Sequence, residues 1–102
     1  MTEDRAAVPI GLADRVTTVP HASAVEIDGE TVVYDRRTEQ VHLLNVIASI
    51  VWWELDGTVT LAALCDQLGS TFGEPVTRIR ADVLALVARL EEAELVGRIN
   101  EP

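Results

Sequence analysis

The dipeptide Asp28-Gly29 stands between two short runs of β-forming residues, and this feature constrains the fold of the chain most strongly. The runs are residues 24–27 and residues 30–34. An Asp-Gly pair favours a two-residue type I′ turn, because both central residues of that turn need a positive φ angle, which glycine adopts freely and aspartate tolerates. The sequence therefore predicts a β-hairpin whose turn is Asp28-Gly29.

A third strand is predicted over residues 41–44, after a polar turn. Side chains alternate along a strand, so Val41 and Leu43 share one face while His42 and Leu44 share the other. Both faces are mostly apolar, and we therefore expect other parts of the structure to cover each of them.

Two helices are predicted after this strand. Asn45 is expected to cap the first, residues 46–55, because its side-chain oxygen can accept from the free backbone N–H groups of the first turn. This segment is so apolar that the helix is expected to be largely buried. Thr60 is expected to cap a second helix, which should end near Leu68, before Gly69.

A third helix is predicted to open with Pro75, whose missing N–H costs nothing in the first turn, and to end near Glu92. The predicted fold class is α+β, with a three-stranded antiparallel sheet followed by three helices in a winged helix-turn-helix arrangement. One domain is expected over residues 22–97, with a flexible or irregular segment over residues 1–21 and a tail over residues 98–102.

The charge balance argues against a nucleic-acid partner. The chain carries eight basic residues against 17 acidic ones, a net charge of −9, and it contains no lysine. A nucleic-acid-binding protein needs positive charge to displace counterions from phosphates. The region of the predicted third helix, residues 74–92, also has more acidic than basic residues, whereas a helix that reads DNA needs base-contacting Arg, Lys, Asn or Gln.

Few side chains offer catalytic or metal-binding chemistry. His21 and His42 are the only histidines, and no nucleophile elbow or glycine-rich oxyanion loop accompanies them. The single cysteine, Cys65, excludes an internal disulfide and a multi-cysteine metal site. The sequence therefore favours a protein that is not an enzyme and that uses neither a cofactor nor a metal.

No part of the sequence is typical of a membrane span or an export signal. The chain lacks a run of about 18 apolar residues, the length that spans a bilayer. Its first residues, Met1 to Asp4, are acidic where a signal peptide is basic and then apolar. A cytoplasmic location without a membrane partner is therefore expected.

The outer edge of the third strand is the feature most in need of a partner. Neither a proline nor an inward-pointing lysine protects this edge. An extended peptide can add there as a fourth strand, pairing with the backbone N–H that we expect His42 to present at the edge. Two alternatives are that the N-terminal segment covers the edge, or that a second copy of the chain covers it in a homodimer.

Two arginines of the predicted third helix, Arg78 and Arg89, lie beside its apolar stripe. One interpretation is that they rim a groove for an acidic ligand. The other is that Arg78 forms helix-stabilising pairs with Glu74 and Asp82, each four residues away, and is otherwise solvated. The sequence leaves both interpretations open.

Several short motifs occur in a set order across residues 22–97. They are Asp28-Gly29-Glu30, Val33-Tyr34-Asp35, Leu44-Asn45, Trp52, Asp56-Gly57, Ala81-Asp82-Val83-Leu84-Ala85-Leu86, Leu90 and Leu95-Val96. In this order and spacing they resemble the PqqD-like family. That family is the peptide-recognition element of pathways that make ribosomally synthesised and post-translationally modified peptides.

The resemblance implies a non-catalytic protein that binds the leader segment of a precursor peptide between the third strand and the third helix. It also implies that the bound peptide is presented to a modifying enzyme, such as a radical-SAM protein, a cyclodehydratase or a leader protease. Carried over by position, one wall of the cleft is Val41, His42, Leu43 and Leu44, and the other is Arg78, Ile79, Asp82, Val83, Leu86 and Arg89.

The sequence departs from the family pattern at Glu94, where glycine is usual. A side chain in the left-handed conformation is strained, so we expect the third helix to end differently here. Two functions of other classes compete with peptide recognition: a winged-helix DNA-binding transcriptional regulator, and a structural dimer in which the edge strands of two copies pair. The charge balance argues against the first of these.

Overall fold

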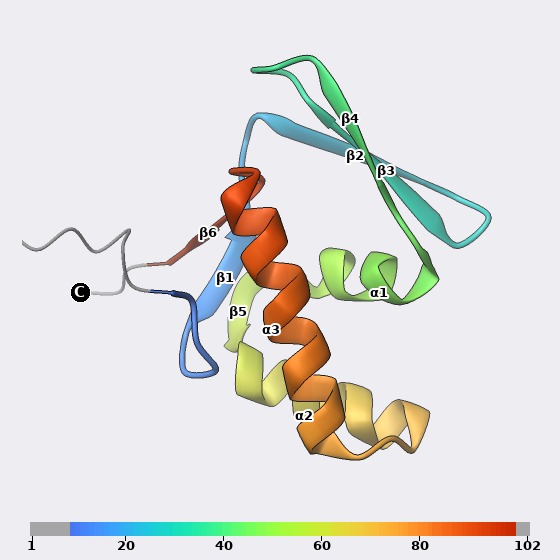
Figure 1. Cartoon of the computed structure of the whole chain (residues 1–102), viewed down its shortest axis with the longest axis vertical. Helices are drawn as coiled ribbons and strands as arrows, with labels where there is room; N and C mark the ends of the chain where they lie inside the picture. The colour runs from blue at the N-terminus through green and yellow to red at the C-terminus, as the bar shows by residue number, and fades with distance from the viewer. Residues whose placement is uncertain (1–8, 100–102) are drawn as a thin grey trace, which may run out of the picture.

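The computed structural model describes residues 9–99, which form two three-stranded antiparallel sheets and three helices (Figure 1). In chain order the elements are β1 (Arg15–Thr18), β2 (Ala22–Ile27), β3 (Glu30–Asp35), β4 (Gln40–Leu44), α1 (Val46–Glu54), β5 (Asp56–Thr60), α2 (Leu61–Phe72), α3 (Val76–Glu92) and β6 (Val96–Arg98). The predicted α+β class is confirmed. The winged helix-turn-helix arrangement of the helices stays a prediction.

The predicted hairpin is formed by β2 and β3. Asp28 has a φ of 53° and Gly29 a φ of 84°, as a type I′ turn requires. β3 also pairs with β4, so the sheet has the order β2-β3-β4 and the third predicted strand is confirmed. The inner face of this sheet packs on α1, where the buried hydroxyls of Thr31 and Ser49 hydrogen bond to each other.

A second sheet, of order β5-β1-β6, is absent from the sequence-based prediction. β1 is its central strand, and Val16 in β1 is almost completely buried. The expectation of irregular structure over residues 1–21 is therefore wrong where the chain forms β1, and the expected tail over residues 98–102 is wrong at Arg98, which lies in β6. Residues 1–8 and 100–102 lie outside the described residues.

The strands of the second sheet escape prediction because their pairing is non-local. Arg15 pairs with Thr60, and Val16 pairs with Arg98, so no turn dipeptide joins any two neighbouring strands. The dipeptide Asp56-Gly57 follows the end of α1 and begins β5. Local propensity and turn signals cannot report a pairing whose partner lies far away in the chain.

Side-chain caps begin the first two helices as predicted. The side chain of Asn45 accepts a hydrogen bond from the N–H of Ala48 at 2.8 Å, and the Thr60 hydroxyl accepts from the N–H of Ala63 at 3.2 Å. α3 ends at Glu92, as predicted, but it begins at Val76, so Pro75 is its N-cap residue and not part of its first turn. These caps fix where α1 and α2 start relative to β4 and β5.

α2 is longer than predicted because Gly69 does not end it. The helix runs through Gly69 to Phe72, and Gly73 follows it in the left-handed conformation with a φ of 66°. A Cβ atom at position 69 would lie 3.4 Å from the carbonyl oxygen of Glu74. The connection to α3 therefore passes close to α2 at this position.

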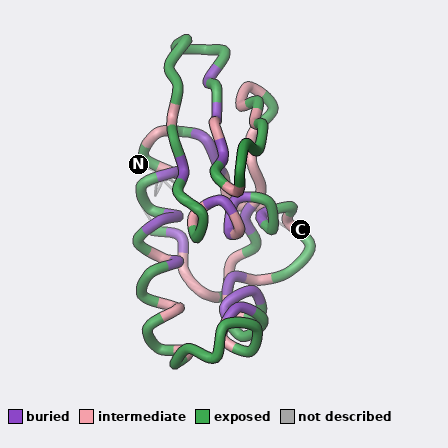
Figure 2. Tube along the Cα trace, turned by 90° about the vertical axis from the view of Figure 1, so that its right-hand side faces the viewer, coloured by how far each residue is buried: buried purple, intermediate pink, exposed green. Residues whose placement is uncertain are grey.

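The core lies where the helices meet the second sheet (Figure 2). The largest fully buried side chains include Leu61 and Leu64 from α2, Val87 from α3 and Leu95, which follows α3. Because Leu95 is buried, the segment after α3 packs against the core. Trp52 is also buried, so α1 is anchored in the same core.

The apolar side chains on the opposite, outward face of sheet β2-β3-β4 are exposed. Their exposed fractions are 78% for Leu43, 58% for Val41, 57% for Val25, 56% for Ile27 and 38% for Tyr34. We call the surface formed by these five side chains the outer face. The expectation that both faces of the third strand are covered is wrong, because within residues 9–99 the helices pack on the inner face alone.

Candidate functional site

Strand β4 forms one edge of sheet β2-β3-β4. Among residues 9–99 its only strand partner is β3, because the N-terminal segment contributes β1 to the other sheet. An uncovered edge presents a row of backbone N–H and C=O groups that another extended chain can pair with. The predicted free edge is therefore present in the structure.

The strand register shows which backbone groups of β4 point outward. Ile27 and Glu30 close the two-residue turn, so they form a hydrogen-bonded pair. Hydrogen-bonded and non-hydrogen-bonded pairs alternate along an antiparallel ladder, so alternate residues of β3 bond to β2 and to β4. Val33 bonds toward β4, and its partner there is His42.

The backbone N–H and C=O of His42 therefore belong to the ladder with β3, and the expectation that His42 presents its N–H at the edge is wrong. The outward groups belong to Val41 and Leu43, which alternate with it. The prediction for His42 failed because the direction of each backbone N–H depends on which residue pair closes the hairpin turn. His42 instead contributes its side chain, on the inner face of the sheet.

A pocket of about 320 Å³ lies between β4 and the C-terminal half of α3, and we call it the β4 pocket. Its lining residues are His42, Leu43, Leu44, Asn45, Ala48, Leu86, Arg89, Leu90 and Ala93. The pocket opens beside the free edge, so a strand added to β4 would lie along it. β2, the other edge of the same sheet, contributes no residue to this pocket.

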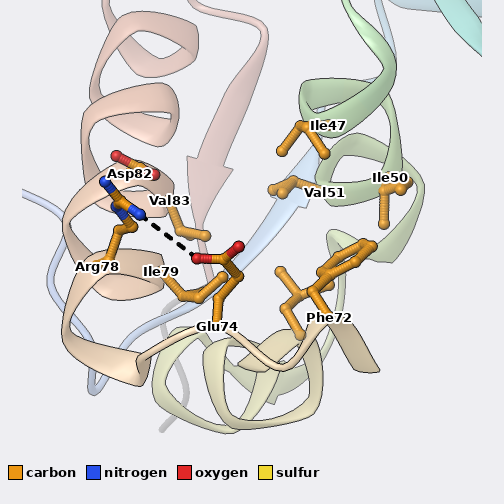
Figure 3. Close-up of a pocket in the computed structure, with 10 residues that line it drawn as sticks. Ile47, Ile50, Val51, Phe72, Glu74, Arg78, Ile79, Asp82 and Val83 are labelled. Atoms are coloured by element: carbon orange, nitrogen blue, oxygen red, sulfur yellow. Dashed lines mark ion pairs between the residues drawn. The ribbon is translucent and has the colours of Figure 1, made fainter. Parts of the chain in front are cut away.

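A larger pocket of about 610 Å³ lies between α1, the end of α2 and the N-terminal half of α3, and we call it the helix pocket (Figure 3). Its lining residues are Ile47, Ile50, Val51, Leu68, Phe72, Glu74, Arg78, Ile79, Asp82 and Val83. Ile79 and Val83 extend from α3 toward Ile47 and Val51 on α1 in Figure 3. The walls are mostly aliphatic, with charged groups at the margin.

The structure distributes the predicted site residues over these two pockets. Five line the β4 pocket, namely His42, Leu43, Leu44, Leu86 and Arg89. Four line the helix pocket, namely Arg78, Ile79, Asp82 and Val83. Val41 lines neither pocket, and its exposed side chain lies on the outer face.

Sequence reasoning missed the walls that α1 and α2 contribute to the helix pocket. Ile47 and Phe72 are exposed and Ile50 is half-buried, although α1 was expected to be largely buried. The signal was present in the sequence, since α1 carries more apolar residues than one buried helix face can use. Within α1, Ser49, Val51 and Trp52 are buried, and the other apolar residues Ile47 and Ile50 line the open helix pocket.

The charged groups at the margin of the helix pocket are largely balanced. Arg78 lies 3.6 Å from Glu74 in an exposed pair, and Asp82 lies on the same helix (Figure 3). The interpretation of Arg78 as a helix-stabilising partner of Glu74 therefore has structural support. Arg89 differs, because it lines the β4 pocket and forms no ion pair within residues 9–99.

An ion-pair network joins the β3–β4 turn to the end of α3, the two elements that flank the β4 pocket. The Arg37 guanidinium donates to Glu94 Oε1 at 2.5 Å and lies 3.5 Å from Asp35 Oδ2. His21 Nε2 donates to the Glu94 carbonyl oxygen at 2.8 Å. This network connects the β3–β4 turn to the residue that follows the end of α3, beside the β4 pocket.

The network shifts the ionisation of its carboxyl groups. The Arg37 side chain, by its hydrogen bond and its charge, lowers the pKa of Glu94 below its usual value. Burial alone would raise the pKa of Asp35, but hydrogen bonds from the backbone of Arg37 and from Thr38 lower it overall. Glu94 also raises the pKa of the Arg37 guanidinium. All three groups are therefore charged in the network at neutral pH.

The described part of the chain offers no other obvious chemistry. Within residues 9–99, no helix has both the length and the apolar character needed to cross a membrane. The same residues hold no group of three or more His, Cys, Asp or Glu side chains arranged to bind a metal ion. Cys65 is buried in the core, which raises the pKa of its thiol and makes it a poor nucleophile.

Two solved structures share this fold. One is described as TbiB1 in complex with the TbiA(beta) leader peptide, with a TM-score of 0.75 and 16% identity, covering 83% of this chain and 99% of that one. The other is described as lasso peptide synthetase B1 complexed with the leader peptide, with a TM-score of 0.73 and 24% identity, covering 81% of this chain and 98% of that one. No curated protein sequence matches the chain significantly.

The sequence profile of one protein family matches most of the chain. The family is described as Coenzyme PQQ synthesis protein D (PqqD), and the match covers residues 30–96. That range begins at β3 and ends at the start of β6, so it includes both pockets and the free edge of β4. The chain therefore belongs to the PqqD family, as the resemblance of its motifs predicted.

Proposed function

We propose that the chain is a non-catalytic peptide-binding module that captures the leader segment of a ribosomally made precursor peptide and presents it to a modifying enzyme. The observation that carries the proposal is the free edge of β4 beside the β4 pocket. In β-strand addition, main-chain hydrogen bonds supply affinity and pockets for alternate side chains supply specificity. Both similar structures are described as complexes with a leader peptide, which supports this function.

In the proposed complex the peptide pairs with the outward N–H and C=O groups of Val41 and Leu43. One set of its alternating side chains enters the β4 pocket, beside Arg89 and the half-buried His42. An apolar side chain farther along the peptide enters the helix pocket, whose walls are mostly aliphatic. Within this proposal the predicted residues act on one ligand, from two pockets that flank α3.

A DNA-binding function has no comparable support. The net charge is −9, and α3 carries acidic residues as well as arginines on its exposed positions. Phosphate binding needs a surplus of positive charge on the docking surface. Neither similar structure is described as a nucleic-acid complex.

The first prediction concerns the edge amide of Leu43. Replacing Leu43 by proline removes an outward N–H without breaking a hydrogen bond to β3, so the fold should survive. Losing this hydrogen bond and introducing the proline ring at the docking edge should weaken peptide binding about tenfold or more. The measurement is fluorescence anisotropy with a labelled synthetic copy of the leader segment encoded beside the gene.

Two controls sharpen this experiment. Leu43→Ala shortens the side chain but keeps the edge N–H, so it should bind the peptide more tightly than Leu43→Pro does. His42→Pro removes a hydrogen bond of the ladder and should lower the melting temperature, as Leu43→Pro should not. Tight peptide binding by Leu43→Pro would contradict strand addition at β4.

A further inference from the structure

The outer face is an apolar surface that has no covering within residues 9–99. The register brings its members together, because Val32 lies between Val25 and Leu43, and Tyr34 pairs with Val41. Isolated exposed apolar residues are normal on a protein surface, but a contiguous apolar patch marks an interaction site. The inner face of the same sheet already packs on α1, so the outer face is not needed for the core.

The charges around the outer face are acidic. Asp28, Glu30 and Glu39 border it, are exposed, and form no ion pair within residues 9–99. The nearby arginines are engaged, since Arg36 hydrogen bonds to Ser23 and the Pro20 carbonyl, and Arg37 to Asp35 and Glu94. A second copy of the chain would bring the same border and a net charge of −9 against this one. A partner with basic groups around an apolar patch is complementary to it.

The outer face is continuous with the peptide edge. Val41 and Leu43 present their backbone groups at the edge of β4 and their side chains on the outer face. A strand added to β4 would extend this surface, because half of its side chains point to the same side of the sheet. A protein seated on the outer face would therefore contact the bound peptide as well.

We propose that the outer face is the surface on which the modifying enzyme docks, through an apolar patch bordered by arginine or lysine side chains. The enzyme then contacts the sheet and the outward side chains of the bound peptide together. The peptide should in consequence strengthen enzyme binding. This inference rests on the proposed function, because it places the partner beside the peptide edge.

The test uses the full chain, the synthetic leader peptide and the purified modifying enzyme encoded beside the gene of this chain. Val25→Glu and Ile27→Glu alter the outer face on β2, the strand farthest from the peptide edge. Val59→Glu is the matched control, since Val59 is also a partly exposed valine of a strand but lies in β5 of the other sheet. Biolayer interferometry measures enzyme binding, and fluorescence anisotropy measures peptide binding separately.

The two outer-face variants should each bind the enzyme about tenfold more weakly than the unmodified chain, as expected when a charge enters an apolar interface. The two outer-face variants should bind the peptide within about twofold of the unmodified chain, because the peptide edge is not altered in them. Val59→Glu should bind the enzyme within about twofold of the unmodified chain, because the outer face is not altered in it. Enzyme binding should also weaken as salt screens the basic and acidic borders.

Three results would overturn the inference. One is full enzyme affinity in both outer-face variants. Another is enzyme binding that is lost equally in Val59→Glu. The third is a dimer of the unmodified chain in sedimentation equilibrium that Ile27→Glu dissociates, because the outer face would then belong to a second copy. A chain that binds the enzyme through the outer face but never binds the peptide would refute the proposed function and leave the docking surface in place.

Discussion

At the scale of single residues, Glu94 shows how the chain tolerates a departure from the family pattern. The expectation that the third helix ends differently is wrong, because Glu94 adopts the left-handed conformation with a φ of 62°. Its carbonyl oxygen accepts a hydrogen bond from His21, as the carbonyl of a glycine also could. Its side chain forms an ion pair with Arg37, which glycine cannot form and which acts against the backbone strain.

Acid should weaken the contribution of this ion pair to stability. The folded-state pKa of Glu94 lies below its ordinary value of 4.5, so the stabilisation is complete above that pH and is lost as the pH falls through the lowered folded value. Glu94→Gln should therefore melt at a lower temperature than the unmodified chain at pH 7. The difference between the two melting temperatures should shrink as the pH falls below 4.5.

Thermal unfolding followed by circular dichroism between pH 7 and pH 3 measures this difference. Glu92→Gln is a suitable control, because Glu92 lies on the last turn of α3 and forms no ion pair within residues 9–99. A difference between Glu94→Gln and the unmodified chain that persists unchanged at pH 3 would contradict an electrostatic role.

At the scale of elements, α1 links the core to the candidate site. Its buried face carries Trp52 and Val51, while Ile47 and Ile50 line the helix pocket. One short helix therefore serves both stability and ligand binding. This double use explains why the helix appears too apolar for a surface position.

The helix pocket yields a prediction that separates binding from folding. Ile47→Glu places a charge in an aliphatic pocket and should weaken peptide binding about tenfold, because the apolar side chain of the peptide loses its partner. The fold should persist, since Ile47 is already exposed. Val46→Glu is the matched control, as Val46 is the exposed neighbour that lines neither pocket. Peptide titration of both variants by amide NMR shifts tests this, and equal affinity of the two would exclude the helix pocket.

Local signals explain which elements were predictable. The Asp28-Gly29 turn, the Asn45 cap and the Thr60 cap each act within a few residues, and each is present as predicted. Strands β1, β5 and β6 depend on pairing between distant segments. The family resemblance indicated β4 and α3 as walls of the candidate site, and the roles of their residues stay a prediction. The division of the site into two pockets required the relative placement of α1, α2 and α3.

At the scale of the whole molecule, the sheet β5-β1-β6 joins the beginning of the described chain to its end. β1 pairs with β5, which precedes α2, and with β6, which follows α3. It therefore joins the segments on either side of the last two helices into one sheet beside the core. The segment expected to be irregular thus contributes a central structural strand. Its removal would affect stability without touching either pocket.

Val16 provides the matching test. Val16→Ala removes two methyl groups from a nearly fully buried position and should lower the free energy of unfolding by about 2 kcal/mol. The same change at Val25, on the outer face, should alter it by less than about 0.5 kcal/mol. Urea denaturation followed by tryptophan fluorescence measures both variants. Equal stability of the two would contradict the placement of β1 at the centre of its sheet.

The pairing of β1 with β6 also determines how this module can be linked to other proteins. The backbone N–H of Ile99 donates to the carbonyl oxygen of Arg15 at 2.9 Å, so the last described residue lies beside the start of β1. The sheet that holds this segment contributes no residue to either pocket. A catalytic domain fused after Ile99 would therefore be tethered at this sheet, and the length of its linker would set how readily it reaches a peptide captured at β4.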